Sequence, residues 1–205
     1  MKQDPGTDLH QEWEQRWHGS DQSERLTWLG KLMFRSKIRA LTEVVGGLDI
    51  SSLVEVGCGL GYTLSVYQKL GISCLGIDIS PSAIEVCENK GLTVRLQNLE
   101  DVEESFDLVS SDGMLEHFLN FEPHAVRLME ISKRYVLLIQ PNHESFVGKT
   151  LVYLAELLRG RENVFEYNYR MQDFAGVFAR NGFVLKTSRP IFADTFRLLL
   201  FEKQN

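Results

Sequence analysis

Short apolar runs alternate with amphipathic stretches along most of the chain. Apolar runs typical of buried strands lie near residues 52–56, 73–77, 92–96, 106–110 and 134–139. Patterns with the period of a helix lie between most of these runs, at 60–70, 81–90 and 122–132. Strands that alternate with helices predict βαβ units, and therefore a parallel sheet with helices on both faces.

The two ends of the chain depart from this alternation. Residues 8–18 and 22–45 read as helices, and Gly46-Gly47 is expected to end the second one. In that second helix one face is apolar: Trp28, Leu29, Leu32, Met33, Ile38, Leu41, Val44 and Val45. Near the other end, the apolar runs 183–187 and 196–201 have no helix between them. So short a connection can join only antiparallel neighbours.

Candidate ligand-binding residues lie at the first strand–helix turn, residues 53–61 (LVEVGCGLG). Gly57, Gly59 and Gly61 remove the Cβ atoms that would keep a ligand away from the backbone. The helix that follows directs free N–H groups at the same point. Asp78, about 20 residues further on at the end of the next strand, is placed to accept both hydroxyls of a ribose. These features predict a nucleoside-binding half-domain.

The spacing of the glycines indicates which nucleoside cofactor is bound. A dinucleotide fingerprint is G-x-G-x-x-G, whereas this chain has G-x-G-x-G preceded by Glu55. That form resembles the first motif of class I S-adenosylmethionine (SAM)-dependent methyltransferases of the methyltransferase type 11 kind. Further segments resemble the family's later motifs in order and without gaps, from residue 50 to 142: 76–80 (GIDIS), 94–101, 106–109, 114–118 and 135–142.

The resemblance implies a fold, a cofactor and a set of binding residues. The fold is α/β, a Rossmann-like doubly wound sheet of seven mostly parallel strands in the order 3-2-1-4-5-7-6, with the last strand antiparallel. The cofactor is SAM. The cofactor-binding residues that we expect are Glu55, Gly57, Cys58, Gly59, Gly61, Asp78, Ile79, Asn98, Leu99 and Ser111. At position 98 the family usually has an acid, but an amide oxygen can still accept from the adenine amine.

His117 is the candidate catalytic residue. It follows the fourth strand, and open α/β sheets bind ligands beyond the carboxyl ends of their strands. An imidazole there could remove a proton from the methyl acceptor. The alternative is that His117 only packs or donates a hydrogen bond beneath the cofactor. Tyr62, in the first helical turn, leaves the same choice between packing and ligand contact.

The composition of the chain indicates which kinds of partner and which cellular location to expect. The chain has 205 residues and a net charge of −6, which disfavours nucleic acid because phosphate binding needs a basic surface. The basic group Lys31, Arg35, Lys37 and Arg39 is interpreted as a solvated helix face. Cys58, Cys74 and Cys87 share no metal-ligand spacing, and no metal is expected. Without a signal peptide or a membrane-length apolar run, we expect a cytoplasmic protein with a small-molecule acceptor, no stable membrane insertion and a homodimer left open.

We expect the chain to have two parts. A helical N-terminal extension covers 1–47, and a methyltransferase domain covers 48–205 with a helical insert at about 143–170. Residues 147–158 are apolar almost all round, which predicts a helix that is buried or pressed against a partner or a lipid-like ligand. That helix would either cover the sheet or shape the acceptor site as a lid. The aromatic N-terminal segment with Trp13 and Trp17 presents the same choice.

The function that follows is SAM-dependent methyl transfer to an oxygen, nitrogen or carbon of a small molecule. A nicotinamide-dependent oxidoreductase is one alternative, because Asp78 would serve a dinucleotide equally well. A non-catalytic SAM-binding module that acts through protein contacts is the other. The glycine spacing and the closing antiparallel pair favour the methyltransferase.

Overall fold

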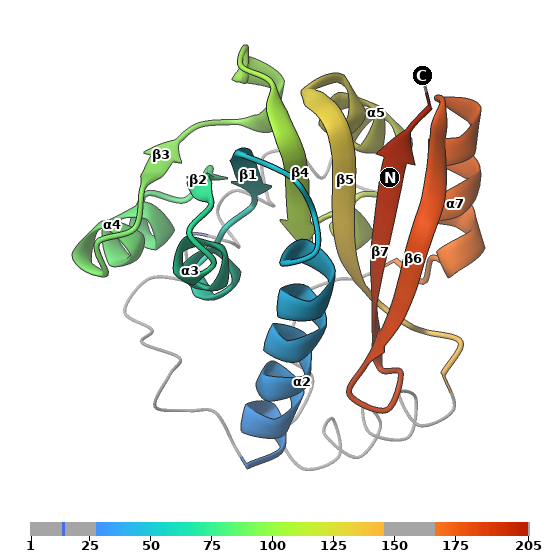
Figure 1. The fold of residues 1–205 in the computed structure, drawn as a ribbon, viewed down its shortest axis with the longest axis horizontal. Helices are drawn as coiled ribbons and strands as arrows, with labels where there is room; N and C mark the ends of the chain where they lie inside the picture. The colour runs from blue at the N-terminus through green and yellow to red at the C-terminus, as the bar shows by residue number, and fades with distance from the viewer. Residues whose placement is uncertain (1–13, 15–27, 146–166, 205) are drawn as a thin grey trace, which may run out of the picture.

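The computed structural model describes residue 14, residues 28–145 and residues 167–204. The helices expected over 8–18 and 147–158 lie outside these ranges. The elements are α2 Trp28–Val45, β1 Ser52–Val56, α3 Tyr62–Lys69, β2 Ser73–Asp78, α4 Pro81–Asn89, β3 Val94–Leu96, η2 Leu99–Asp101, β4 Phe106–Asp112, η3 Leu115–His117, α5 Glu122–Glu130, β5 Ser132–Pro141, α7 Met171–Arg180, β6 Phe183–Ile191 and β7 Phe196–Lys203 (Figure 1).

All seven strands join one sheet in the order β3-β2-β1-β4-β5-β7-β6. Pairs within β3-β2-β1-β4-β5 are parallel, whereas β7 runs antiparallel to both β5 and β6. The predicted topology is therefore confirmed, including the antiparallel strand near the C-terminus.

Each face of the sheet has its own apolar layer, as the alternation along β5 shows. Val136 and Leu138 pack in a cluster with side chains of α5 and α7. Leu137 and Ile139 point to the other face, where they pack with side chains of α2 and α3. In Figure 1, α2 and α3 lie in front of the sheet. Helices on both faces follow from strands that are apolar on both sides.

Helix α2 is buried at one end only. Its C-terminal half packs through Leu41 and Val45, which are 0% and 1% exposed. Near its N-terminus, Trp28 is 72% exposed and Leu32 is 36% exposed. The apolar face of α2 is therefore buried only towards its C-terminus, because the N-terminal end of the helix extends past the strand ends (Figure 1).

The carboxyl ends of the central strands meet at one edge of the sheet. Strands β1, β4 and β5 are parallel and end at Val56, Asp112 and Pro141. The β6–β7 turn lies at the same edge, because Asn142 donates its backbone N–H to the Thr195 carbonyl at 2.8 Å. Among the helices that the structure describes, none has the length and apolar character needed to cross a membrane.

Candidate functional site

The turn after β1 has a left-handed backbone at every second residue. Gly57, Gly59 and Gly61 have φ values of 71°, 49° and 73°, a region that side chains with a Cβ disfavour. At Gly61 a Cβ would also lie 2.3 Å from Leu92 Cδ1 and 2.8 Å from Cys87 Sγ. The alternating glycines of the sequence are therefore required by the path of the backbone itself.

Asp78 joins the end of β2 to this turn. Its Oδ2 accepts the Gly59 N–H at 2.8 Å and its Oδ1 accepts the Ser80 N–H at 2.9 Å. Burial raises the pKa of Asp78, while the N–H groups of Ser80 and Gly59 oppose that rise. Each carboxylate oxygen keeps a further lone pair, so the side chain can still accept from two hydroxyls.

A second acid lies beside Asp78 and was not predicted. Glu14 accepts the Ser80 hydroxyl at 2.6 Å and the Ser82 N–H at 3.4 Å, and also bonds the Ser82 hydroxyl. Its negative charge contributes to the raised pKa of Asp78. Glu14 therefore places a carboxylate at the start of α4, where Ser80 is the N-cap and accepts the Ala83 N–H at 3.2 Å. A single acid in a helical pattern carries no local signal of such a contact.

Glu55 and Ser111 provide buried polar atoms on neighbouring strands. In the β1–β4 register Glu55 pairs with Ser110 and Val56 pairs with Ser111, so Glu55 and Ser111 lie near the same strand ends but face opposite sides of the sheet. Within the described ranges, Glu55 Oε2 and Ser111 Oγ have no hydrogen-bond partner. Burial and the nearby Asp112 charge raise the pKa of Glu55 well above its ordinary value. Since buried polar atoms are normally paired, these two fit a site that a polar ligand completes.

Lys37 forms an ion pair at the end of β4, which corrects its interpretation as part of a solvated helix face. Its Nζ lies 2.7 and 2.9 Å from the two Asp112 oxygens, and Thr63 donates its hydroxyl to Asp112 at 2.8 Å. The Lys37 side chain is only 19% exposed. The spacing could have revealed this, because Lys37 lies one helical turn before the buried Leu41 and on the same face.

Asn98 and Leu99 follow β3, next to the end of β2. The Asp78 carbonyl accepts the Gln97 N–H at 3.0 Å, which brings this segment beside Asp78. Asn98 Oδ1 caps η2 by accepting the Glu100 N–H at 3.3 Å, and Leu99 is buried. The Asn98 oxygen keeps a second lone pair for a base amine.

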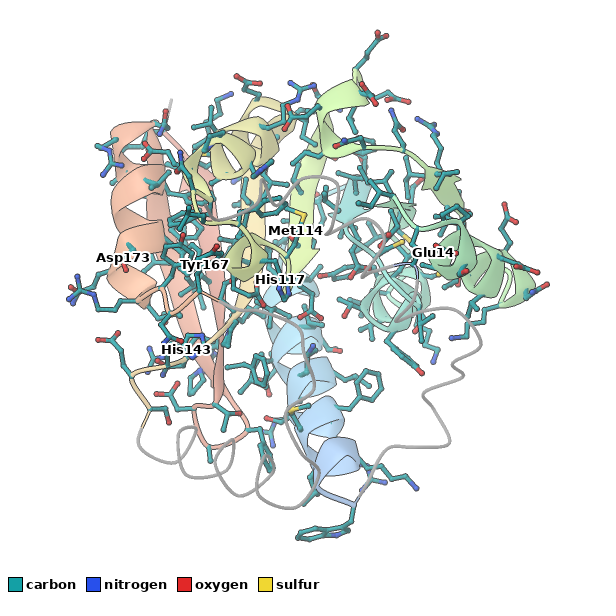
Figure 2. The ribbon with its side chains drawn as sticks, turned by 180° about the vertical axis from the view of Figure 1, so that it is seen from behind. Glu14, Met114, His117, His143, Tyr167 and Asp173 are labelled. Carbon is teal, nitrogen blue, oxygen red and sulfur yellow. The ribbon has the colours of Figure 1, made fainter. Side chains whose placement is uncertain are left out.

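The short helix η3 brings His117 against the glycine turn. The His117 N–H donates to the Met114 carbonyl at 3.2 Å, and the Met114 Sδ lies 3.6 Å from where a Gly57 Cβ would be. His117 is 6% exposed. The Glu116 carbonyl accepts the Tyr167 N–H at 2.7 Å, so Tyr167 adjoins η3 and lies near His117 (Figure 2). His117 is therefore buried beside the expected cofactor turn, and its chemical role stays a prediction.

The cysteines gather beneath the same turn without forming a metal site. Cys58 and Cys87 share a side-chain hydrogen bond, and that bond together with burial raises the pKa of the Cys58 thiol. Cys87 Sγ donates to the Gly59 carbonyl at 3.2 Å, and Cys74 packs next to them. Among the described residues, no group of three or more His, Cys, Asp or Glu side chains could hold a metal ion.

Part of the chain is similar in sequence to known methyltransferases. A family model described as a methyltransferase domain matches residues 54–135. The ubiquinone biosynthesis O-methyltransferase of Methylococcus capsulatus is 37% identical over 90 residues, covering 39% of this chain and 36% of that protein. The ajmaline N-methyltransferase of Rauvolfia serpentina is 27% identical over 88 residues, covering 42% of this chain and 30% of that protein. The matched region is thus about a third of the length of these curated relatives.

Solved structures match over nearly the whole chain. Magnesium protoporphyrin IX methyltransferase from Synechocystis, with bound SAM, has a TM-score of 0.71 at 16% identity and covers 99% of both chains. The 1,6-didemethyltoxoflavin N1-methyltransferase of Burkholderia thailandensis has a TM-score of 0.70 at 11% identity, covering 100% of this chain and 93% of that one. At these identities the likeness shows the fold.

The strand order, the glycine turn with Asp78 and the family match agree on one class. Residues 54–135 match the methyltransferase-domain model, and the described residues have the fold of solved methyltransferases. SAM is bound in the solved magnesium protoporphyrin IX methyltransferase structure of this fold.

Proposed function

We propose that the protein transfers a methyl group from SAM to a small molecule. The observation that carries the proposal is the left-handed glycine turn joined to Asp78. At the neighbouring strand ends, buried oxygens of Glu55 and Ser111 have no hydrogen-bond partner among the described residues. This combination provides a close backbone approach, an acceptor for ribose hydroxyls and polar atoms that need a ligand. A nicotinamide-dependent oxidoreductase would have the first two features but calls for the wider glycine spacing.

The nucleoside part of SAM would lie along the ends of β1, β2 and β3. In the proposal, Gly57, Cys58, Gly59 and Gly61 offer backbone to the ligand, Asp78 accepts the ribose hydroxyls with Ile79 beside it, and Asn98 and Leu99 contact adenine. The support is their placement: Gly59 and Asp78 are hydrogen-bonded, and the Gln97 N–H donates to the Asp78 carbonyl. Glu14 closes the same corner through the start of α4.

The amino-acid part of SAM would meet the ends of β1 and β4. It carries one ammonium and one carboxylate, the same pair of charges that Asp112 and Lys37 present. We propose that Asp112 receives the ammonium and Lys37 the carboxylate, so that ligand binding replaces one ion pair with two. Glu55 and Ser111, whose buried oxygens lack partners within the described ranges, would complete this end of the site.

Bound SAM supplies an activated methyl group on a sulfonium, so the protein mainly has to align the acceptor and accept a proton. His117 is the proposed base because it is buried beside the glycine turn and adjoins Tyr167 through η3. The acceptor atom remains open among oxygen, nitrogen and carbon. Relatives named for N- and O-methylation both match this chain, which supports a small-molecule acceptor without selecting its atom.

Titration calorimetry with S-adenosylhomocysteine, the demethylated product, tests the cofactor. We expect binding by the wild type and a loss of tenfold or more in Asp78→Asn, because each charge-assisted hydrogen bond contributes roughly 1.5–3 kcal/mol. Asp49→Asn is the matched control, an exposed carboxylate before β1 whose loss should leave affinity unchanged. Binding of NADH with no response to S-adenosylhomocysteine would overturn the proposal in favour of an oxidoreductase.

His117→Ala tests the base once a mixture of metabolites has yielded an acceptor that gains the mass of one methyl. Turnover should fall by about 100-fold while the affinity for S-adenosylhomocysteine stays the same. A parallel loss of affinity would place His117 in the wall of the cofactor site. Binding of S-adenosylhomocysteine without methylation of any component would favour the non-catalytic module.

A further inference from the structure

A cavity of about 570 Å³ lies between the first turns of α7 and the β6–β7 hairpin. Pockets for drug-sized molecules have roughly 300–1,000 Å³, so the volume suits a small organic ligand. Its described lining comes from four elements that are far apart in the sequence: the loop after β5, α7, β6 and β7. None of these residues belongs to the cofactor site described above.

The lining of the cavity reaches the same edge of the sheet as the glycine turn. Asn142, which lines it, directly follows β5 and is tied to the β6–β7 turn through Thr195. Tyr167 connects the two places, because it bonds η3 and lies shortly before α7 begins. In Figure 2, Tyr167 lies between His117 and Asp173 of α7. A molecule in the cavity would therefore approach the methyl site from the α7 side.

Both apolar and charged residues line the cavity. Met171, Ala175, Leu185 and Leu199 supply the apolar lining. Its only charged residues within the described ranges are Glu144, Asp194 and Arg197. Two negative charges and one positive charge leave a net charge of −1, which disfavours an anionic ligand and favours a cationic one.

Arg197 is held in place rather than free to bind an anion. Its Nε and Nη2 donate to the two Asp194 oxygens at 2.8 and 3.0 Å, and its Nη1 donates to Ser188 at 3.0 Å. The bond to Asp194 raises the pKa of the Arg197 guanidinium, so it stays charged and paired. Glu144 is exposed, and its charge also helps to raise the pKa of the Arg197 guanidinium, although no ion pair within 4.0 Å joins Glu144 to another described residue.

The backbone that carries Asp194 is strained. Phe192, Ala193 and Asp194 have φ values of 43°, 52° and 64°, a run of left-handed residues without a glycine. Such a run costs conformational energy and persists only where the surroundings hold it. Here the Phe192 N–H donates to Ser36 of α2 at 2.9 Å, and the Thr195 carbonyl accepts from Asn142. The turn thereby fixes the Asp194–Arg197 pair at the cavity.

We infer that this cavity binds the methyl acceptor, and that the acceptor combines an apolar body with a protonated amine held near Glu144. That the bound molecule is a methyl acceptor rests on the proposed function. The preference of the cavity for a cation does not depend on that function. The apolar lining would contact the body of the molecule. Because Arg197 is already paired with Asp194, the cavity would not favour compounds that carry an acidic group.

Amide spectra of the ¹⁵N-labelled protein test this with two probes of similar shape, benzylamine and phenylacetate. Benzylamine should shift the amide signals of Ser188 and Leu199, with phenylacetate binding at least about fivefold more weakly. Glu144→Gln should weaken benzylamine by about threefold, the scale of an exposed ion pair. Glu88→Gln, an exposed acid on α4, is the matched control and should change nothing.

The double variant Glu144→Gln/Asp194→Asn turns the net charge of the cavity from −1 to +1 and should reverse the order of the probes. Asparagine tolerates the left-handed backbone at position 194, so the turn should persist. The inference is overturned if neither probe shifts these amides, if the wild type prefers phenylacetate, or if the double variant keeps the original order. Calorimetry with S-adenosylhomocysteine on the same samples separates this outcome from a failure of the proposed function.

Discussion

The two halves of the sheet reach the ligand edge in different ways. Strands β1 and β2 end in turns whose important residues are close in sequence, such as Gly57, Gly59 and Asp78. Strands β5, β7 and β6 reach the same edge through contacts between distant segments, such as Ser36 with Phe192 and Asn142 with Thr195. A local motif therefore marks the cofactor half, whereas the other half is recognisable only after folding.

The largest expected effect is a loss of stability on substituting Gly61 in the cofactor half. A second glycine substitution distinguishes the contribution of close packing from that of backbone strain. Gly61→Ala should lower the free energy of unfolding by roughly 2–5 kcal/mol, since a Cβ adds left-handed strain and a clash with Leu92 and Cys87. Gly71→Ala is the control, with φ of 78° and nothing within 4 Å of its Cβ position, and should cost about 1–2 kcal/mol. Urea unfolding measures both. Equal losses would show that Gly61 serves only the turn conformation.

The next effect concerns the pH dependence that buried Glu55 imposes on the same half. Its folded pKa is raised by burial, so between the unfolded and the folded pKa only the folded state keeps the proton. Stability from this group is therefore present at low pH and is lost as the pH rises toward the folded pKa. Glu55→Gln cannot titrate, so it should gain stability relative to the wild type at pH 8 but not at pH 4. Parallel curves of stability against pH would contradict a raised pKa.

Lys37 tests whether α2 takes part in the cofactor half. Lys37→Met removes the partner of Asp112 and the proposed contact to the ligand carboxylate, so affinity for S-adenosylhomocysteine should fall by about tenfold. Lys31→Met, on the exposed side of the same helix, should leave affinity unchanged. If both variants bind like the wild type, the Lys37–Asp112 pair is only a structural link between α2 and β4.

These three residues also show how far the sequence could predict the molecule. The strands and the glycine turn were predictable because period-2 and period-3.6 patterns and φ requirements are local properties. The side-chain partners of Lys37 were not, because Asp112 lies 75 residues away and a basic residue on a helix is usually solvated. The contacts of Glu14 and Arg197 and the left-handed turn at 192–194 were not predicted for the same reason, because their partners come together only through tertiary packing.

The smallest effect measures the strain in the second half. Ala193→Gly relieves a left-handed residue at φ 52°, and the greater entropy of glycine in the unfolded chain offsets part of the gain. The expected result is stabilisation of up to about 1 kcal/mol. Ala179→Gly in the exposed part of α7 should have the opposite sign, a loss of about 1 kcal/mol. Destabilisation by both changes would mean that the turn is not strained.

One measurement tests directly whether the two halves hold different ligands: the amide spectrum of the ¹⁵N-labelled protein with saturating S-adenosylhomocysteine. The account predicts shifts at Gly57, Gly59, Asp78, Leu99 and Ser111, while Ser188 and Leu199 stay where they are. Shifts centred on Ser188 and Leu199, with the glycine turn unmoved, would contradict it.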